Sequence, residues 1–200
     1  MHNDRYAKLS EGDVLDSLKQ AGAILSGHFV LTSGRHSDTY VQCARVLEDS
    51  LLTTRLAEAS VAALPEQRID LVASPAVGGI IIGFAVAQAL GVKFIFTERE
   101  QGTMTFRRSF HVPAGSRVLV VEDVVTTGGS VREVTDLIEA AGGEVAGIVS
   151  IIDRGGEKKF DAELQSLLKL EVESWEPASC AQCATGVGLD SPGSRRLSSK

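Results

Sequence analysis

The chain has 200 residues, of which 44% are hydrophobic and 23% are charged, with a formal net charge of −6. This length and composition are those of one folded, water-soluble domain and exclude a disordered chain. The acidic balance argues against a general nucleic-acid binder, which needs a basic face. No apolar run approaches the roughly 18 residues of a membrane span, and the N-terminus lacks the apolar core of a signal peptide. We therefore expect a cytoplasmic protein that binds neither nucleic acid nor membrane.

The first elements in chain order are helical. Ser10-Glu-Gly-Asp13 resembles a capping box at the start of a helix that Gly22 would end. A second amphipathic pattern runs over residues 50–64, and Pro65 is expected to close it.

A regular alternation of strands and helices follows. We expect strands at residues 69–73, 92–96, 117–121 and 144–152, and helices at 80–90 and 129–141. Nearly continuous apolar strands between helices are typical of a mostly parallel, twisted sheet covered on both faces, which is an α/β fold. The helix over 80–90 is apolar on almost every side and is expected to be buried.

The segment Val118–Ser130 carries the strongest chemical signal. A buried strand delivers Glu122 and Asp123 to the carboxyl edge of the sheet, where open parallel sheets bind ligands. Thr126-Thr-Gly-Gly-Ser130 then opens a helix, and its backbone N–H groups, glycines and hydroxyls suit a phosphate monoester. The carboxylates can accept hydrogen bonds from paired sugar hydroxyls, so the segment predicts a site for ribose 5-phosphate. The alternative is an ordinary capped turn in which the acids are merely solvated. No P-loop, dinucleotide or zinc-protease motif competes with this interpretation.

The same segment resembles the signature with which type I phosphoribosyltransferases bind 5-phosphoribosyl 1-pyrophosphate (PRPP). Residues 27–42 are similar to the N-terminal hood motif of the orotate phosphoribosyltransferase family, and Ser150–Arg154 to its Asp-Arg at the end of a late strand. The resemblance covers roughly residues 15–172. It implies a type I phosphoribosyltransferase fold over residues 1–176, with a small hood over about 10–45. It also implies transfer of ribose 5-phosphate from PRPP to orotate, which gives orotidine 5′-monophosphate and pyrophosphate.

The resemblance also implies roles for individual residues. Asp123 and Arg99 are the expected catalytic residues, and Thr126 and Arg154 are expected to contact orotate. A guanidinium independently suits a planar anion, although Arg154 could instead form a surface salt bridge. The expected PRPP-binding residues are Val77, Gly78, Glu122, Asp123, Val124, Val125, Thr126, Thr127, Gly128, Gly129 and Ser130.

Two loops of the family are recognisable here with fewer positive charges. Ser74–Gly79 corresponds to the pyrophosphate loop, which often contains a non-proline cis peptide; a lysine common near Gly78 is absent, as is another at Thr32. Residues 98–108 correspond to the mobile catalytic loop, which reaches into the neighbouring subunit of a homodimer with shared active sites. This stretch has no lysine and three arginines, of which Arg99 is favoured for pyrophosphate and the other two, Arg107 and Arg108, stay open. An ordinary solvated hairpin is the alternative, and the turnover rate is left open.

Mg²⁺ is the expected cofactor, bound by substrate phosphate plus one or two carboxylates rather than by a dedicated cluster of side chains. Two other functions remain as alternatives: transfer to a purine or another base, and a non-catalytic PRPP-sensing regulator.

The C-terminal residues 177–200 are expected to form a mobile tail. Within them, Cys180-Ala-Gln-Cys183 fits half of a zinc site, a redox pair or incidental spacing equally well. The histidines His28, His36 and His111 show no metal-binding pattern, and a structural role is favoured for His36.

Overall fold

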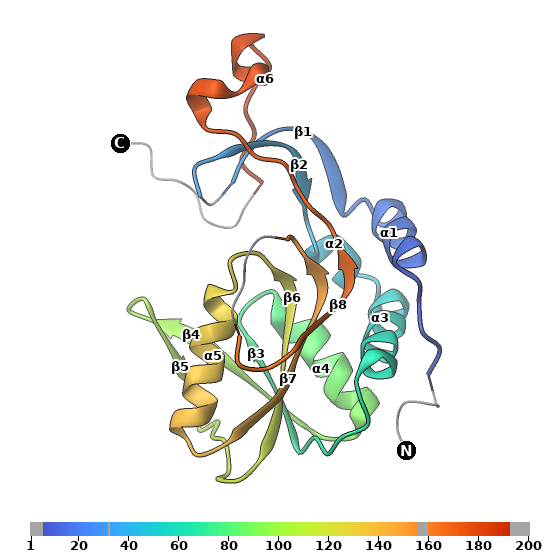
Figure 1. Ribbon diagram of the computed structural model, residues 1–200, viewed down its shortest axis with the longest axis vertical. Helices are drawn as coiled ribbons and strands as arrows, with labels where there is room; N and C mark the ends of the chain where they lie inside the picture. The colour runs from blue at the N-terminus through green and yellow to red at the C-terminus, as the bar shows by residue number, and fades with distance from the viewer. Residues whose placement is uncertain (1–5, 32, 156–159, 193–200) are drawn as a thin grey trace.

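The computed structural model describes residues 6–31, 33–155 and 160–192 (Figure 1). Its centre is a six-stranded sheet in the order β5-β4-β3-β6-β7-β8, in which every neighbouring pair is parallel except β4 and β5. This confirms the predicted α/β fold with a mostly parallel sheet. None of the helices in this part of the chain is long and apolar enough to cross a membrane.

The elements have the following bounds. The helices are α1 (Glu11–Gln20), α2 (Ala44–Leu47), α3 (Ser50–Ala63), α4 (Gly79–Leu90), α5 (Gly129–Ala140), the 3₁₀ turn η2 (Pro177–Ser179) and α6 (Ala181–Ala184). The strands are β1 (Ile24–Val30), β2 (His36–Val41), β3 (Leu71–Pro75), β4 (Lys93–Glu100), β5 (Thr103–Phe106), β6 (Arg117–Val125), β7 (Glu144–Asp153) and β8 (Leu164–Lys169).

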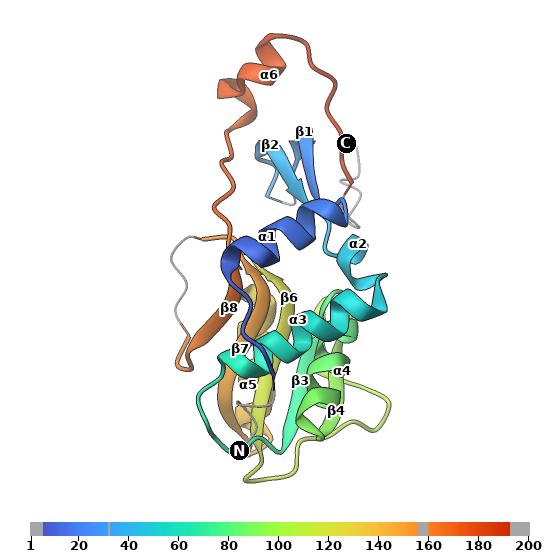
Figure 2. The ribbon, with the colours of Figure 1, turned by 90° about the vertical axis from the view of Figure 1, so that its right-hand side faces the viewer.

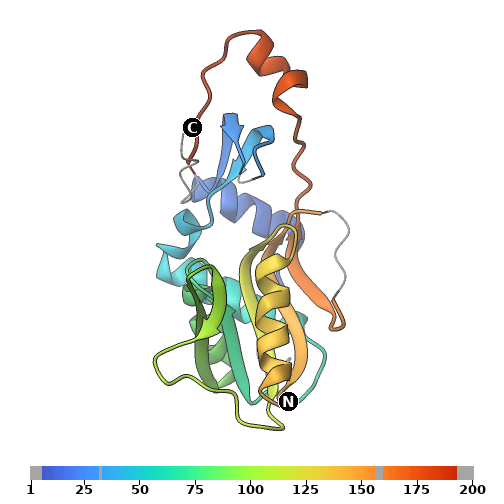
Figure 3. The same cartoon turned by 90° about the vertical axis from the view of Figure 1, so that its left-hand side faces the viewer.

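Alternation along the central strand β6 divides the core into two layers. Leu119 and Val121 join the cluster that packs under α3 and α4, whereas Val118 and Val120 join the cluster under α5. Successive side chains of a strand point to opposite faces, so a continuous apolar strand needs helices on both sides. Figures 2 and 3 show α3 and α4 on one face of the sheet and α5 on the other.

The expected burial of the apolar helix is wrong for one side of α4. Ile81 is 50% exposed and Phe84 is 59% exposed, and the preceding Val77 is 82% exposed. Ile82 and Val86 on the opposite side are fully buried. Composition alone could not distinguish the side that meets the sheet from the side that does not, because both are equally apolar.

Two further elements differ from the sequence expectation. The strand β6 continues through Val125, so Glu122 and Asp123 lie within the strand rather than in the following turn. The polar stretch after residue 96 is an antiparallel hairpin of β4 and β5, in which Thr97 pairs with Phe106 and Glu100 with Thr103. Gln101 and Gly102 at its tip both have positive φ, as a tight two-residue turn requires.

The hood contains the antiparallel pair β1 and β2, and it also involves the C-terminal segment, which we define as residues 175–192. Trp175 bridges to His36 of β2, and Asp190 bridges to Phe29 of β1 (Figure 1). The segment 175–192, of which residues 177–192 were expected to belong to a mobile tail, is therefore hydrogen-bonded to both hood strands. Residues 193–200 of that tail and Thr32 lie outside the described residues.

Candidate active site

The two acids of β6 have different surroundings. Glu122 is 8% exposed, and its burial, followed by the neighbouring charge of Asp123, raises the pKa of Glu122 well above its usual range. Asp123 is half-buried, and one of its carboxylate oxygens accepts a hydrogen bond from the backbone N–H of Val124 at 2.9 Å. The more exposed Asp123 is thus the carboxylate available to a ligand, with Glu122 beneath it.

The loop between β3 and α4 lies directly against these acids. A Cβ atom placed on Gly78 would be 2.6 Å from one carboxylate oxygen of Asp123 and 2.7 Å from the other. A Cβ atom on Gly79 would be 3.2 Å from Glu122 Oε1. The Ala76–Val77 peptide bond is cis, as the family resemblance implied for this loop. The predicted pyrophosphate loop and the predicted ribose-binding acids therefore border the same space.

The turn after β6 forms a small hollow. It is lined by Glu122, Val124, Val125, Thr126, Thr127, Gly128, Gly129, Ser130 and Val131. Gly128 has φ +74°, a conformation that glycine adopts readily, and it leads into α5. Within the described chain, no acceptor receives the backbone N–H groups of residues 127–130, which is the usual state of a helix start ready for an anion. Arg132 donates to the carbonyl of Thr127 at 3.0 Å and so holds this turn in shape.

Arg154 lies beside the same turn because β7 is parallel to β6. Val125 pairs with Asp153, and the Arg154 backbone N–H donates to the Val125 carbonyl at 3.0 Å. Burial lowers the pKa of Arg154, and the nearby Tyr40 offsets part of this effect. Its Nε is buried without a hydrogen-bond partner among the described residues. An anionic planar ligand would satisfy this guanidinium, and among the described residues Arg154 forms no salt bridge; its role toward orotate stays a prediction.

Tyr40 of the hood is a site residue that sequence reasoning missed. Burial raises the pKa of its hydroxyl, Arg154 lowers it and Asp123 raises it, so the ring lies within electrostatic range of both groups. The sequence feature that could have indicated this role is the position of Tyr40 within the hood motif, residues 27–42. Nothing in the sequence indicates that β2 brings this ring to the carboxyl edge of the main sheet.

The three loop arginines each have an acidic partner within the chain. Arg99 Nη2 lies 2.8 Å from Glu133 Oε2 on α5, and Arg107 lies 3.7 Å from Glu100. Arg108 makes two hydrogen bonds to Glu98, at 3.0 and 3.1 Å. Arg99 is thus paired with α5 and the other two arginines with β4, and the role of Arg99 toward pyrophosphate stays a prediction.

A helix-start turn with free backbone N–H groups, two carboxylates and a glycine loop meet at the carboxyl edge of a parallel sheet, and together these are typical of a phosphoribosyltransferase. Residues 49–179 match the family model described as "Phosphoribosyl transferase domain". A solved orotate phosphoribosyltransferase from Aeropyrum pernix is 29% identical, with a TM-score of 0.67 over 78% of this chain and 93% of that chain. An adenine phosphoribosyltransferase from Thermoanaerobacter pseudethanolicus has a TM-score of 0.65 over 78% of this chain and 99% of that chain; at 22% identity it shows only the shared fold.

Relatives with much higher sequence identity narrow the class of phosphoribosyltransferase. An orotate phosphoribosyltransferase from Heliobacterium modesticaldum is 49% identical over 94% of this chain and 100% of its own length. One from Chlorobium phaeobacteroides (strain BS1) is 48% identical over 94% of this chain and 98% of its own length. The chain belongs to the orotate phosphoribosyltransferase family.

Proposed function

We propose that this chain transfers the ribose 5-phosphate group of PRPP to orotate and releases orotidine 5′-monophosphate and pyrophosphate. The observation that carries the proposal is that Asp123 lies against Gly78 of the loop before α4, while the adjacent Glu122 lines the hollow formed by the turn 126–130. The relatives named orotate phosphoribosyltransferase supply the acceptor.

PRPP has three groups to bind, and the site offers a partner for each. The free N–H groups and hydroxyls of residues 126–130 suit the 5′-phosphate. The Asp123 carboxylate, with Glu122 below it, suits the 2- and 3-hydroxyls of the ribose. The loop at Val77 and Gly78 lies next to Asp123, where the pyrophosphate at C1 of that ribose would extend.

Orotate binding rests on Arg154 and Thr126. Orotate is a planar anion, and a guanidinium can donate two parallel hydrogen bonds to a carboxylate or to a pair of carbonyl oxygens. The partly buried position of Arg154 strengthens such a bond, because water competes less there. Tyr40 offers a ring on the hood side of the same space.

The reaction depends mainly on how the site positions the two substrates. A ring nitrogen of orotate attacks C1 of the ribose as the C1–oxygen bond to pyrophosphate breaks, through an oxocarbenium-like state. The attacking nitrogen gives up its proton to water or to an oxygen of the leaving pyrophosphate, and the electron pair of the broken bond leaves with pyrophosphate. The carboxylates of β6 fix the ribose, and exclusion of water protects the cationic carbon from hydrolysis.

Mg²⁺ is proposed as the cofactor, bound with PRPP. The carboxylate oxygens of Asp123 at the border of the pyrophosphate loop are the hard donors that this ion prefers, so these residues fit it. The ion would neutralise charge on the leaving pyrophosphate. This matters because the loop 74–79, the hairpin stretch 98–108 and the turn 126–130 carry no lysine.

We also propose that the chain acts as a homodimer with shared sites. The exposed apolar side chains Val77, Ile81 and Phe84 support this, because they cluster at the start of α4 beside the site. A cytoplasmic location stays a prediction.

The assay that tests the proposed function follows the loss of orotate absorbance with PRPP and Mg²⁺, and then with a chelator. We expect turnover that requires both PRPP and the metal ion, and a fall of at least about a hundredfold in kcat/KM for PRPP in the folded Asp123→Asn variant. Adenine, guanine and uracil, tested one at a time, separate this activity from that of other base transferases. PRPP binding without turnover of any base would instead support the sensing regulator.

A further inference from the structure

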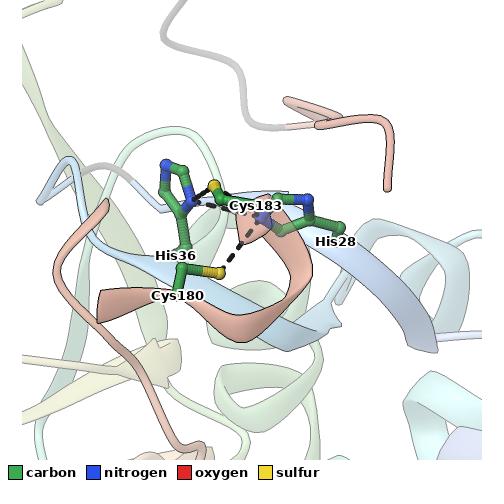
Figure 4. A group of neighbouring side chains, drawn as sticks. All are labelled: His28, His36, Cys180 and Cys183. Carbon is green, nitrogen blue, oxygen red and sulfur yellow. Dashed lines mark hydrogen bonds between the residues drawn. The ribbon is translucent and has the colours of Figure 1, made fainter. Parts of the chain in front are cut away.

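Four potential metal ligands converge at the far end of the hood. His28 from β1, His36 from β2, and Cys180 and Cys183 from the C-terminal segment place one ligand atom each within 4.8 Å of all the others (Figure 4). His28, His36 and Cys180 are no more than 5% exposed, whereas Cys183 lies at the surface. Cys180 directly precedes the short helix α6 and Cys183 lies within it, and the histidines belong to paired strands, so three separate elements meet here.

Four of the six separations between these atoms are close to those of a tetrahedral zinc site. Zinc–sulfur bonds of about 2.3 Å and zinc–nitrogen bonds of about 2.0–2.1 Å place neighbouring ligand atoms roughly 3.3–3.8 Å apart in a tetrahedron. The separation between His28 Nε2 and His36 Nδ1 is 3.1 Å. Cys180 Sγ lies 3.4 Å and Cys183 Sγ 3.6 Å from His28 Nε2, and Cys183 Sγ lies 3.2 Å from His36 Nδ1.

The tautomer of His28 also suits a metal ligand. Its Nδ1 lies 2.9 Å from the carbonyl oxygen of Val187 and can bond to it only by donating its proton. Nε2 then carries a lone pair directed into the cluster. Metal-ligating histidines usually donate their other ring N–H in this way, which fixes the orientation of the ring.

Hydrogen bonds within the cluster do not account for this arrangement. His36 Nδ1 and both sulfur atoms surround His28 Nε2 at 3.1–3.6 Å, yet a single lone pair can accept only one good hydrogen bond. The cysteines are free thiols rather than a disulfide. A cation at the centre would satisfy all four atoms at once.

We propose that His28, His36, Cys180 and Cys183 bind one structural Zn²⁺ ion. Two thiols lose their protons on binding, two neutral imidazoles contribute lone pairs, and the complex is uncharged, which suits its partial burial. Four protein ligands close the coordination sphere, so this site is structural and is separate from the proposed Mg²⁺ site at Asp123. The ion fastens the C-terminal segment to both hood strands, in addition to two isolated bridges and a hydrogen bond from Gln182 to the Gly27 carbonyl.

This site also resolves the interpretation of the Cys-x-x-Cys pair that the sequence left open. Half of the ligand set was visible at residues 180 and 183. The other half, at residues 28 and 36, is about 150 residues away in the chain and shows no metal-binding spacing, so only the fold brings the two halves together.

The test is the metal content of the full chain, purified without chelator and desalted, measured by inductively coupled plasma mass spectrometry. We expect about one zinc ion per chain in the wild type and less than about a tenth of that in Cys183→Ser, whose exposed side chain can change without disturbing the core. Cys43→Ala is the matched control, because it removes the third cysteine, which lies outside the cluster, and should keep its zinc.

A second measurement does not depend on any variant. Wild-type protein reloaded with Co²⁺ should show the visible bands of a tetrahedral ion and a thiolate-to-metal charge-transfer band. Wild-type protein that holds no zinc as purified, and takes up neither Zn²⁺ nor Co²⁺ when reduced, overturns the proposal. So does zinc that remains at the wild-type level in both Cys183→Ser and Cys180→Ser. Neither result would bear on orotate transfer, which the absorbance assay measures separately.

Discussion

Gly78 is the residue at which the loop before α4 approaches the Asp123 carboxylate of β6. We expect Gly78→Ala to lower kcat/KM for PRPP by about a hundredfold, because the new Cβ would displace the Asp123 carboxylate from 2.6 Å away. Stability should change little, since Val77 next to it is already at the surface. Steady-state kinetics and thermal unfolding measure the two effects. Gly147→Ala in β7 is the control, because its nearest neighbour would lie 3.7 Å away, and equal kinetics in both variants would contradict the close approach.

Arg154 should affect one substrate more than the other. Loss of a charge-assisted hydrogen bond costs about 1.5–3 kcal/mol, so Arg154→Ala is expected to raise the KM for orotate about tenfold to a hundredfold. The KM for PRPP should change far less, because the groups proposed to bind PRPP are the turn 126–130, Asp123 and the loop at Gly78 rather than the Arg154 guanidinium. Arg68→Ala, which removes an exposed guanidinium at the opposite end of β3, is the control. An equal rise in both KM values would count against contact with orotate.

At the scale of single residues, sequence reasoning succeeded where neighbours in the chain are also neighbours in space. Glu122, Asp123 and the turn 126–130 follow one another along a single strand and turn, so their proximity was predictable. Tyr40 and the four atoms around His28 come from distant segments, and their meeting depends on how the hood is placed. The partner of Arg99 was equally hidden, because Glu133 lies on a helix 34 residues away.

At the scale of elements, Asp70 fastens the beginning of β6 to the residue before β3. Its carboxylate accepts hydrogen bonds from the Arg117 backbone N–H at 2.9 Å and from Arg68 Nε at 2.7 Å. The bond from Arg117, and then that from Arg68, lower the pKa of Asp70 below its ordinary value of 3.8. A carboxylate with a lowered pKa stabilises the folded state fully above its unfolded-state pKa and loses this effect as pH falls through the folded-state value.

We therefore expect Asp70→Asn to lower the unfolding temperature at neutral pH, and the difference from wild type to shrink only below about pH 3.8. Thermal unfolding at several pH values measures it. Asp136→Asn, which removes an exposed carboxylate from α5, serves as the control. A difference that stays constant down to the most acidic samples would show that the charge of Asp70 is not the cause.

The hairpin β4–β5 and the helix α4 show why element prediction failed in part. The end of β4 was not predicted, because residues 98–100 are charged or polar rather than apolar. The following turn depends on a positive φ at Gln101, and glutamine has no special preference for that conformation. For α4 the predicted burial was too extensive, because the apolar surface of this helix exceeds what the sheet can cover. Such excess is informative at a larger scale, because exposed apolar side chains commonly mark a contact between subunits.

At the scale of the whole molecule, the proposed shared sites can be tested by mixing two inactive variants. If the hairpin of one subunit acts in the site of its partner, Arg99→Ala and Asp123→Asn supply different halves of the same site. Random mixing makes about half of the dimers mixed, with one intact site of two, so about a quarter of wild-type activity should return.

The control is a mixture of Arg99→Ala with the double variant Arg99→Ala/Asp123→Asn. No dimer in this mixture has an intact site. Activity that stays at the level of the separate variants after subunit exchange would contradict a shared site. Glu133→Gln addresses the same point within one chain. It frees Arg99 from its ion pair at 2.8 Å and should preserve activity if the arginine works elsewhere.

The path of the C-terminal segment has a consequence for the order of events during synthesis. The hood strands β1 and β2 leave the ribosome early, but the carbonyl that fixes His28 belongs to Val187, 159 residues later. The central sheet, by contrast, has all of its strands once β8 has emerged. A nascent chain can therefore complete the sheet before the hood has its last partners, and the hood should be the final part of the molecule to form.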